Sequence, residues 1–302
     1  MAECRGRIGP VVALLCLLVG VAACSTTTAS PASSTTAAAP VSNALAEVPV
    51  SGASVAALHY AANDNLSADG SYPAGRLGFN LADIGNVDQL DALPSGVSGL
   101  VFLGLCNGAD SKFRSRVDPF VNHQRLFGFY VMDDADPASC AAANLAAETA
   151  YIHTHIKGAR TFLVQQNLSS SKTPTYRGGY NPANTGIDLF GLDPYPCRSE
   201  INGCDDAVIA GYVSAATSAG IPIAAVVPVF QAFGGRVWAD DDGGYYVLPT
   251  AEQATRLVAE WQRLVPSPVF DYAYSWSVQR GDLALSVAPE ALRNVFANHN
   301  YS

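Results

Sequence analysis

The sequence predicts an α/β fold, a closed (β/α)8 TIM-like barrel in a single domain. Short strand-like segments alternate with longer helical patterns throughout the chain after residue 75. Several of these segments are nearly continuous apolar runs, which is typical of parallel strands buried on both faces. Residues 46 to 302 form a stretch of 257 residues, and single barrels commonly reach about 250 residues. No glycine-rich phosphate loop follows a strand-like segment, which favours a barrel over a doubly wound nucleotide-binding sheet.

Seven strands are predicted directly from the apolar segments. They span Arg76–Leu81, Gly99–Leu105, Leu126–Met132, Thr161–Gln166, Ile187–Leu192, Ile223–Phe230 and Phe270–Trp276. An eighth strand is expected either at Ala284–Val287 or in the earlier segment Val55–Tyr60. Repeated strand-helix-strand units imply parallel pairing with right-handed crossovers.

Two of the intervening helices have a recognisable apolar stripe. In Ala251–Leu264, apolar residues recur at spacings of three and four and give one face toward the sheet, and Ala142–Ile156 shows the same pattern more weakly. Asp136 followed by Pro137 is typical of a helix N-cap with proline at the first helical position.

The first residues predict an exported lipoprotein. A short segment with Arg5 and Arg7 precedes an apolar run that ends in small residues before Cys24. This order matches a signal peptide over residues 1–23, and the run is shorter than the roughly 20 residues of a spanning helix. Small residues before a cysteine resemble a lipobox, which implies lipid on Cys24 and attachment to the extracytoplasmic face of the cell membrane. Ordinary secretion without an anchor is the alternative.

A polar tether is predicted to follow Cys24. Residues 24–45 are dominated by Ser, Thr, Ala and Pro, a composition that cannot bury a core. The folded domain is therefore expected over residues 46–302. Membrane lipid is expected as a partner of the chain through Cys24.

The charge balance excludes several partners. Without residues 1–23 the chain has 15 basic and 25 acidic side chains, a net charge of −10. Such an acidic surface repels phosphate backbones and anionic lipid, so nucleic-acid binding is disfavoured. Neutral or cationic ligands remain open.

Four cysteines in the folded part predict two disulfides. An even number of cysteines in an exported chain indicates disulfides, and four cysteines allow three pairings. Cys197 with Cys204, and Cys106 with Cys140, is the simplest arrangement because the first pair flanks one short polar segment. The four cysteines form no CxxC pair and no histidine lies near them, so no zinc site is predicted. The sequence contains no cofactor motif, so no cofactor is predicted either.

Carboxyl groups cluster after two predicted strands. Asp133 and Asp134 follow one strand, and Asp193 follows another. In a barrel the working residues lie just past the C-terminal strand ends. Two carboxyl groups at one rim suit a glycosidase, in which one protonates the leaving oxygen and the other acts as base or nucleophile. Asp134, Asp193 and Asp133 are therefore the candidate catalytic residues; bracing of loops is their alternative, structural interpretation.

Other strand ends supply candidate substrate-binding residues. These are Asn80, Tyr195, Gln231 and Trp276. The aromatic residues suited to stacking on sugar rings are Trp276, Tyr195, Phe233 and Trp238.

The phrases FGFYVMDDADP, DLFGLDPYPC, VPVFQAFGG and FDYAYSW, with Gly78-Phe79-Asn80, resemble secreted bacterial glycoside-hydrolase-like TIM barrels. The resemblance covers roughly Arg76 to Asn300 and implies a carbohydrate ligand. In better-studied members an Asp-Glu-Pro or Asn-Glu-Pro phrase carries the acid/base glutamate, which implies that role for Asp134. The retaining members place a glutamate nucleophile late in the barrel, where this chain has Gln231. The resemblance therefore leaves an inverting hydrolase using Asp134 with Asp193 or another carboxylate, or a barrel that binds glycan without cleaving it. A structural envelope lipoprotein is a further alternative.

Three other types of site are disfavoured by spacing. Asp240-Asp241-Asp242-Gly243-Gly244 lacks the pattern of an EF-hand loop and predicts a solvated turn rather than calcium. The five histidines are scattered along the chain and predict no ligand set. No Gly-x-Ser-x-Gly phrase supports a serine hydrolase.

Overall fold

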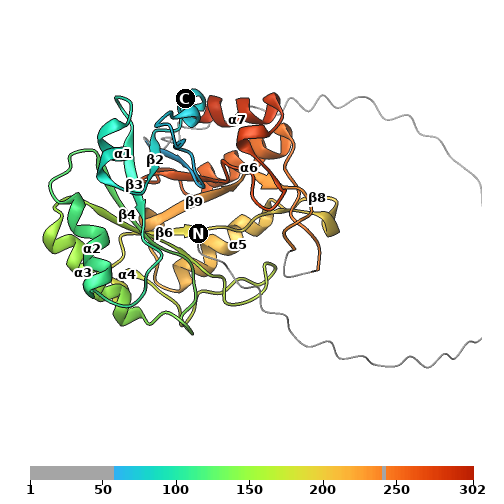
Figure 1. Cartoon of the computed structure of the whole chain (residues 1–302). Coiled ribbons are helices and arrows are strands. Elements are labelled where there is room, and N and C mark those ends of the chain that lie inside the picture. Colours follow the sequence, from blue (N-terminus) through green and yellow to red (C-terminus); the bar gives the residue numbers. More distant parts are fainter. Residues whose placement is uncertain (1–57, 240–242) are drawn as a thin grey trace, which may run out of the picture. The chain divides into compact units, whose positions relative to one another are not determined.

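A computed structural model describes residues 58–239 and 243–302 of the chain (Figure 1). The signal peptide, Cys24, the tether, the start of the predicted domain and Asp240–Asp242 lie outside the described residues. None of the helices in the described ranges combines the length and the hydropathy needed to span a bilayer.

Eight parallel strands form a closed barrel, which confirms the predicted fold class. In spatial order the strands are β1, β11, β9, β6, β5, β4, β3 and β2, and every neighbouring pair is parallel. Their bounds are β1 His59–Ala61, β2 Leu81–Ile84, β3 Ser98–Phe102, β4 Leu126–Ala135, β5 Arg160–Gln165, β6 Leu189–Leu192, β9 Val226–Gln231 and β11 Asp271–Tyr274.

Helices cover the outside of the ring (Figure 1). They are α1 Val87–Ala92, α2 Ser111–Val117, α3 Ala142–His155, α4 Pro182–Thr185, α5 Ala207–Ser218, α6 Ala251–Leu264 and α7 Glu290–Asn300. The bounds predicted for α6 match the structure, and α3 ends one residue earlier than predicted. Short two-stranded sheets, β7 Cys197–Arg198 with β8 Gly203–Cys204 and β10 Phe233–Gly234 with β12 Leu283–Ala284, decorate the loops.

Side chains from all eight strands fill the barrel interior, with two each from β5 and β9. They are Tyr60, Leu81, Leu100, Tyr130, Phe162, Val164, Leu189, Val227, Val229 and Tyr272. Because successive side chains of a strand point to opposite faces, the alternate positions pack outward against the helices. Burial of aromatic and branched side chains on both faces is the main stabilising term of such a fold.

The eighth strand comes from the earlier of the two candidate segments. β1 overlaps the end of Val55–Tyr60, whereas Leu285–Val287 forms a 3-10 helix and β12 pairs outside the barrel. The predicted strand Arg76–Leu81 is wrong over most of its length, since Pro73–Leu77 is a 3-10 helix and β2 begins at Leu81. Gly78, with φ of 79°, ends that 3-10 helix, because this left-handed conformation suits glycine.

Asp136 does not cap α3, contrary to the prediction. Its side chain accepts a hydrogen bond from the N–H of Ala138 at 2.8 Å and so closes a turn after β4. The helix begins six residues later at Ala142, with Ala141 as its N-cap.

Both predicted disulfides are confirmed. Cys106–Cys140 joins the loop after β3 to the loop after β4, and Cys197–Cys204 closes a short hairpin after β6.

Candidate functional site

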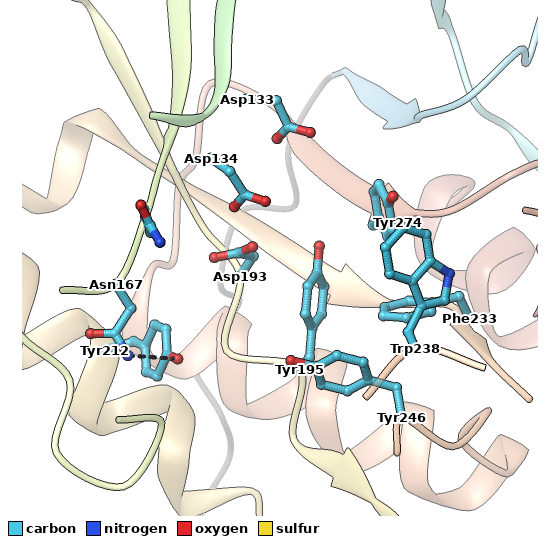
Figure 2. Close-up of a pocket in the computed structure, with 11 residues that line it drawn as sticks. Asp133, Asp134, Asn167, Asp193, Tyr195, Tyr212, Phe233, Trp238, Tyr246 and Tyr274 are labelled. Atoms are coloured by element: carbon cyan, nitrogen blue, oxygen red, sulfur yellow. Dashed lines mark hydrogen bonds between the residues drawn. The ribbon is translucent and has the colours of Figure 1, made fainter. Parts of the chain in front are cut away.

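A cavity of about 260 Å³ lies at the C-terminal end of the barrel strands (Figure 2). It is lined by three carboxyl groups, two amides and six aromatic rings: Asp133, Asp134, Asp193, Gln166, Asn167, Tyr195, Tyr212, Phe233, Trp238, Tyr246 and Tyr274. The structure thus brings together the three candidate catalytic residues and Tyr195. This set is called the rim cavity below.

An irregularity in β4 places two consecutive aspartates in the same cavity. Side chains of a regular strand alternate between faces, so Asp133 and Asp134 would point apart. The pairing of β4 with β5 shifts register twice, between Tyr130 and Met132 and again between Met132 and Ala135. Asp134 also adopts a positive φ of 44°. Such bulges re-aim side chains next to functional sites, and here both carboxyl groups line the rim cavity.

Asp193 is the most strongly perturbed of the three carboxyl groups. It follows β6 directly and is only partly exposed. Burial, and then the negative charges of Asp134 and Asp133, raise the pKa of Asp193 well above its ordinary range. A carboxyl group in this environment retains its proton at a pH at which an exposed aspartate has lost it.

Asp133 and Asp134 differ from Asp193 because both reach solvent. The cavity walls nevertheless desolvate Asp133 and raise its pKa, while a hydrogen bond from the hydroxyl of Tyr130 opposes that shift. Tyr130 therefore fixes the orientation of Asp133. Asp134 is the exposed carboxyl group between Asp133 and Asp193 in Figure 2.

Aromatic rings form the wall opposite the carboxyl groups (Figure 2). The ring of Tyr195 lies 4.9 Å from Phe233, 5.5 Å from Tyr246 and 5.8 Å from Tyr274, measured between centroids. Tyr195 adopts a φ of 37°, a conformation that costs an L-residue about 1–2 kcal/mol. Such strained residues concentrate at functional sites, where the surrounding packing holds them in place.

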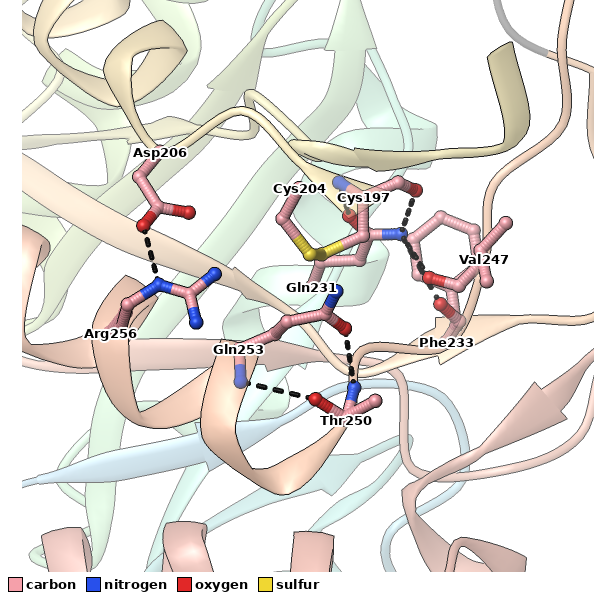
Figure 3. The surroundings of a disulfide bond; sticks show 9 residues. All are labelled: Cys197, Cys204, Asp206, Gln231, Phe233, Val247, Thr250, Gln253 and Arg256. Atoms are coloured by element: carbon pink, nitrogen blue, oxygen red, sulfur yellow. Dashed lines mark hydrogen bonds and ion pairs between the residues drawn. A yellow bond between two sulfur atoms is a disulfide. The ribbon is translucent and has the colours of Figure 1, made fainter. Parts of the chain in front are cut away.

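The predicted substrate-binding role of Gln231 is not supported by its position. Its side chain is 2% exposed and does not line the rim cavity. The amide oxygen accepts from the N–H of Cys197 at 2.8 Å, and the amide nitrogen donates to the carbonyls of Cys197 and Val247 at 3.0 and 3.1 Å (Figure 3). Gln231 instead fastens the disulfide hairpin and a later loop to the end of β9.

Trp276 and Asn80 also lie outside the rim cavity. Trp276 is 8% exposed and packs edge-on against Phe79, with ring centroids 6.4 Å apart. Asn80 precedes β2 rather than following a strand, so it lies at the opposite end of the barrel, where its side-chain oxygen accepts from the N–H of His59 at 2.8 Å. Asn80 was expected at the rim because the strand Arg76–Leu81 was predicted too early in the chain. Trp276 was expected there because the last strand was predicted to end at residue 276, whereas β11 ends at Tyr274.

Three aromatic residues of the cavity were not predicted. Tyr274 ends β11, so the rule that selected Trp276 applies better to Tyr274. Tyr212 comes from α5, and its hydroxyl accepts a hydrogen bond from Asn167 at 3.2 Å. Tyr246 comes from the loop after β10. Tyr212 and Tyr246 do not follow a barrel strand, so the sequence pattern did not indicate that they line the cavity.

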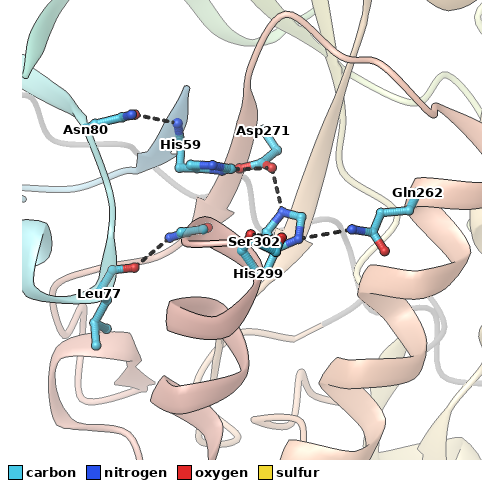
Figure 4. A network of polar contacts seen from close by, with 8 residues as sticks. His59, Leu77, Asn80, Gln262, Asp271, His299 and Ser302 are labelled. Atoms are coloured by element: carbon cyan, nitrogen blue, oxygen red, sulfur yellow. Dashed lines mark hydrogen bonds and ion pairs between the residues drawn. The ribbon is translucent and has the colours of Figure 1, made fainter. Parts of the chain in front are cut away.

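The opposite end of the barrel holds a buried polar cluster that contains two of the five histidines. His59 and His299, distant in sequence, both bond the carboxylate of Asp271, at 2.9 and 2.7 Å (Figure 4). Burial raises the pKa of Asp271, but the hydrogen bonds from His299 and His59 outweigh it and hold the pKa below its ordinary value. Gln262 lies 3.3 Å from the other nitrogen of His299, so the cluster is satisfied by hydrogen bonds.

No protein-family model matches the sequence, and a comparison with curated proteins found no match. Among solved structures, the chain is similar to a GH18 chitinase from Cycas revoluta in complex with (GlcNAc)3, with a TM-score of 0.53 at 10% identity over 82% of this chain and 99% of that chain. The same enzyme with allosamidin gives a TM-score of 0.51 at 11% identity, over 82% and 99%. A GH18 chitinase from the chitin utilization locus of Flavobacterium johnsoniae gives 0.50 at 10% identity, over 82% and 94%. At these identities the likeness establishes the barrel fold.

Proposed function

We propose that the chain is a glycoside hydrolase that acts on a polysaccharide. The observation that carries this proposal is the pairing of Asp193, whose pKa is raised, with the exposed Asp134 in one aromatic-lined cavity. Two carboxyl groups whose environments differ in this way are the equipment of glycosidic acid/base catalysis. The likeness to barrels that bind GlcNAc oligosaccharides agrees with a carbohydrate ligand.

The environments assign the roles differently from the sequence resemblance. Asp193 retains its proton and is the general acid that protonates the oxygen of the departing sugar. Asp134 reaches solvent and acts as the base: it takes a proton from water while the water oxygen bonds to the anomeric carbon. Gln231 is bonded to backbone and supplies no nucleophile. The reaction thus breaks one glycosidic C–O bond and consumes one water molecule.

Asp133 and the aromatic wall serve binding in this scheme. Tyr130 holds Asp133 in a fixed orientation, so its carboxyl group can accept hydrogen bonds from sugar hydroxyls. The rings of Tyr195 and Trp238 offer apolar faces to the C–H surfaces of a pyranose. The rim cavity, at about 260 Å³, suits one or two sugar rings rather than a long segment.

The test compares product formation from a panel of neutral and amino-sugar polysaccharides. Asp193→Asn and Asp134→Asn should each lower the rate by about 10²–10⁴-fold while oligosaccharide binding is retained. Asp136→Asn is the matched control, since Asp136 belongs to the same segment but does not line the cavity. If all three variants kept the rate of the unsubstituted chain, Asp193 and Asp134 would have no part in the mechanism.

A glycan-binding protein without catalysis is the second candidate. The observation in its favour is Gln231, which occupies the late-strand position of a nucleophile and is fully engaged in backbone hydrogen bonds. This candidate predicts that the unsubstituted chain binds oligosaccharide and releases no product. Asp193→Asn would then leave binding unchanged and have no activity to remove.

We also propose that the chain is carried on the extracytoplasmic face of the membrane by lipid on Cys24. The order of the first 24 residues and the polar composition that follows support this localisation. A single acyl chain binds a bilayer only marginally, so stable attachment needs more than one. Cys24→Ala should abolish both lipid labelling and membrane partition; unchanged partition would refute the anchor.

A further inference from the structure

A second hollow lies beside the rim cavity at the same end of the barrel. Its volume is about 380 Å³, and it is lined by residues of β1, β2, β3, β4 and β11, of the loops after β1 and β2, and of α1. Asp133 lines both hollows, so the two meet at this carboxyl group. The mechanism above uses only the rim cavity and leaves the second hollow unassigned.

A tyrosine-bonded carboxyl group lies in the second hollow. Asp83, near the end of β2, accepts a hydrogen bond from the hydroxyl of Tyr60 and another from the N–H of Asn65 at 3.3 Å. Burial raises the pKa of Asp83 to about 6. The arrangement repeats that of Tyr130 with Asp133, so each hollow holds a carboxyl group fixed by a barrel tyrosine. A carboxyl group has more acceptor sites than these bonds use.

An exposed aromatic ring borders the same hollow. Phe102 ends β3 and is 45% exposed, which is a high value for phenylalanine at the rim of a barrel. Its ring packs edge-on against Tyr130, with centroids 5.2 Å apart, and this contact fixes its orientation. An exposed ring beside an oriented carboxyl group is the combination by which proteins hold a pyranose: the ring stacks on the C–H face and the carboxyl group accepts a hydroxyl.

We propose that the second hollow is a further sugar-binding subsite, so that the ligand is an oligosaccharide lying across Asp133 from Phe102 to the aromatic wall of the rim cavity. This inference rests on the proposed function and specifies its substrate. The acidic side chains lining the second hollow are Asp64, Asp83 and Asp133, and no lysine or arginine is among its described lining residues. The subsite is therefore suited to neutral or amino sugars and repels uronic acids.

The test measures binding of oligosaccharides of two lengths by calorimetry. The probes are N-acetylglucosamine and glucosamine oligomers of two and six units, and the Asp193→Asn background prevents cleavage during the measurement. The six-unit probe should bind more tightly than the two-unit probe. Phe102→Ala should weaken binding of the six-unit probe by about tenfold and leave the two-unit probe within about twofold, since only the longer chain reaches the second hollow.

Two variants guard against indirect effects. Phe102→Tyr retains the ring and should keep the affinity for the longer probe. Val121→Ala truncates another exposed side chain, in the loop before β4 at the opposite end of the barrel, and should change neither affinity. A six-unit galacturonic acid oligomer should bind at least tenfold more weakly than its glucosamine counterpart.

The outcomes separate the two proposals. If the longer probe binds and Phe102→Ala leaves its affinity unchanged, the second subsite is wrong and the proposed function stands. Equal affinity for the uronic acid oligomer also overturns the subsite as described. If the unsubstituted chain neither binds nor cleaves any probe, both proposals fail together.

Discussion

The side-chain amide of Gln231 pairs with the backbone of Cys197 as a neighbouring peptide would: its oxygen accepts from the N–H, and its nitrogen donates to the carbonyl. A third hydrogen bond reaches the carbonyl of Val247. One buried amide thus joins the end of β9 to two loops that border the rim cavity.

Gln231→Glu should therefore destabilise the protein without adding activity. A carboxylate cannot donate to the carbonyls of Cys197 and Val247, and it would be buried as a charge, at a cost of roughly 3 kcal/mol. Urea unfolding measures this cost. Gln253→Glu is the control, because Gln253 uses its oxygen to accept from the N–H of Thr250 and a glutamate does the same. A gain of activity in Gln231→Glu would contradict this prediction and would indicate that a glutamate at this position can act as the nucleophile of a retaining glycosidase.

Asp193→Asn should stabilise the protein while removing its activity. The folded state holds the proton of Asp193 more tightly than the unfolded chain does, so the stability of the native protein falls as pH rises from the ordinary aspartate pKa through the raised one. An amide has no such penalty. The melting temperature at pH 8 should rise by about 2–4 °C for each kcal/mol recovered, and the gain should vanish at pH 3. A lower melting temperature at pH 8 would contradict the raised pKa.

Glu148 should impose a pH dependence on stability near neutral pH. Its side chain on α3 is buried, and desolvation raises its pKa to about 8, although the N–H of Asn107 donates to it at 3.0 Å. Because the unfolded chain releases this proton near pH 4, stability should fall as pH rises from about 5 to 8. Melting temperatures of Glu148→Gln should fall less over that range. Glu290→Gln, at an exposed position, should follow the wild-type curve.

Asp271→Asn should destabilise the barrel at neutral pH and matter less in acid. Hydrogen bonds from His299 and His59 hold the pKa of Asp271 below its ordinary value, so the stability it confers is present above pH 4 and is lost as pH falls through the lowered pKa. Loss of the buried partner should cost about 3 kcal/mol at pH 7. Denaturant unfolding of the variant and the unsubstituted protein at pH 7 and at pH 3 measures the loss of stability at each pH. Asp118→Asn, at an exposed aspartate, should show neither effect.

The fold was predictable from sequence because burial on both faces leaves a strong pattern. The barrel strands β3, β4, β5, β6, β9 and β11 are largely apolar, and each begins within a few residues of its predicted start, although the lengths of several differ from the prediction. β1 and β2 were harder to predict. β1 has only three residues, and β2 follows a 3-10 helix whose apolar residues resemble those of a strand in the sequence.

The candidate site was predictable only in part. The rule that function follows the C-terminal strand ends located Asp133, Asp134, Asp193 and Tyr195. It failed for Gln231 and Trp276, because the rule selects a position along the chain and does not determine side-chain direction. The second hollow was not predicted, since Asp83 and Phe102 acquire meaning only when the closed ring places them beside Asp133.

The barrel is closed by its first and last strands, and this fixes the order in which the site can be assembled. β1 pairs with β11 at three positions, more than 200 residues later, and with β2 at one. During synthesis the candidate catalytic aspartates emerge long before Tyr274 of β11, so a nascent or truncated chain ending before residue 271 holds these carboxyl groups without the last strand of the barrel and without the Tyr274 side of the rim cavity. Such long-range contacts are also the slow ones to form. Activity should therefore appear as a late event in refolding, in step with closure of the ring.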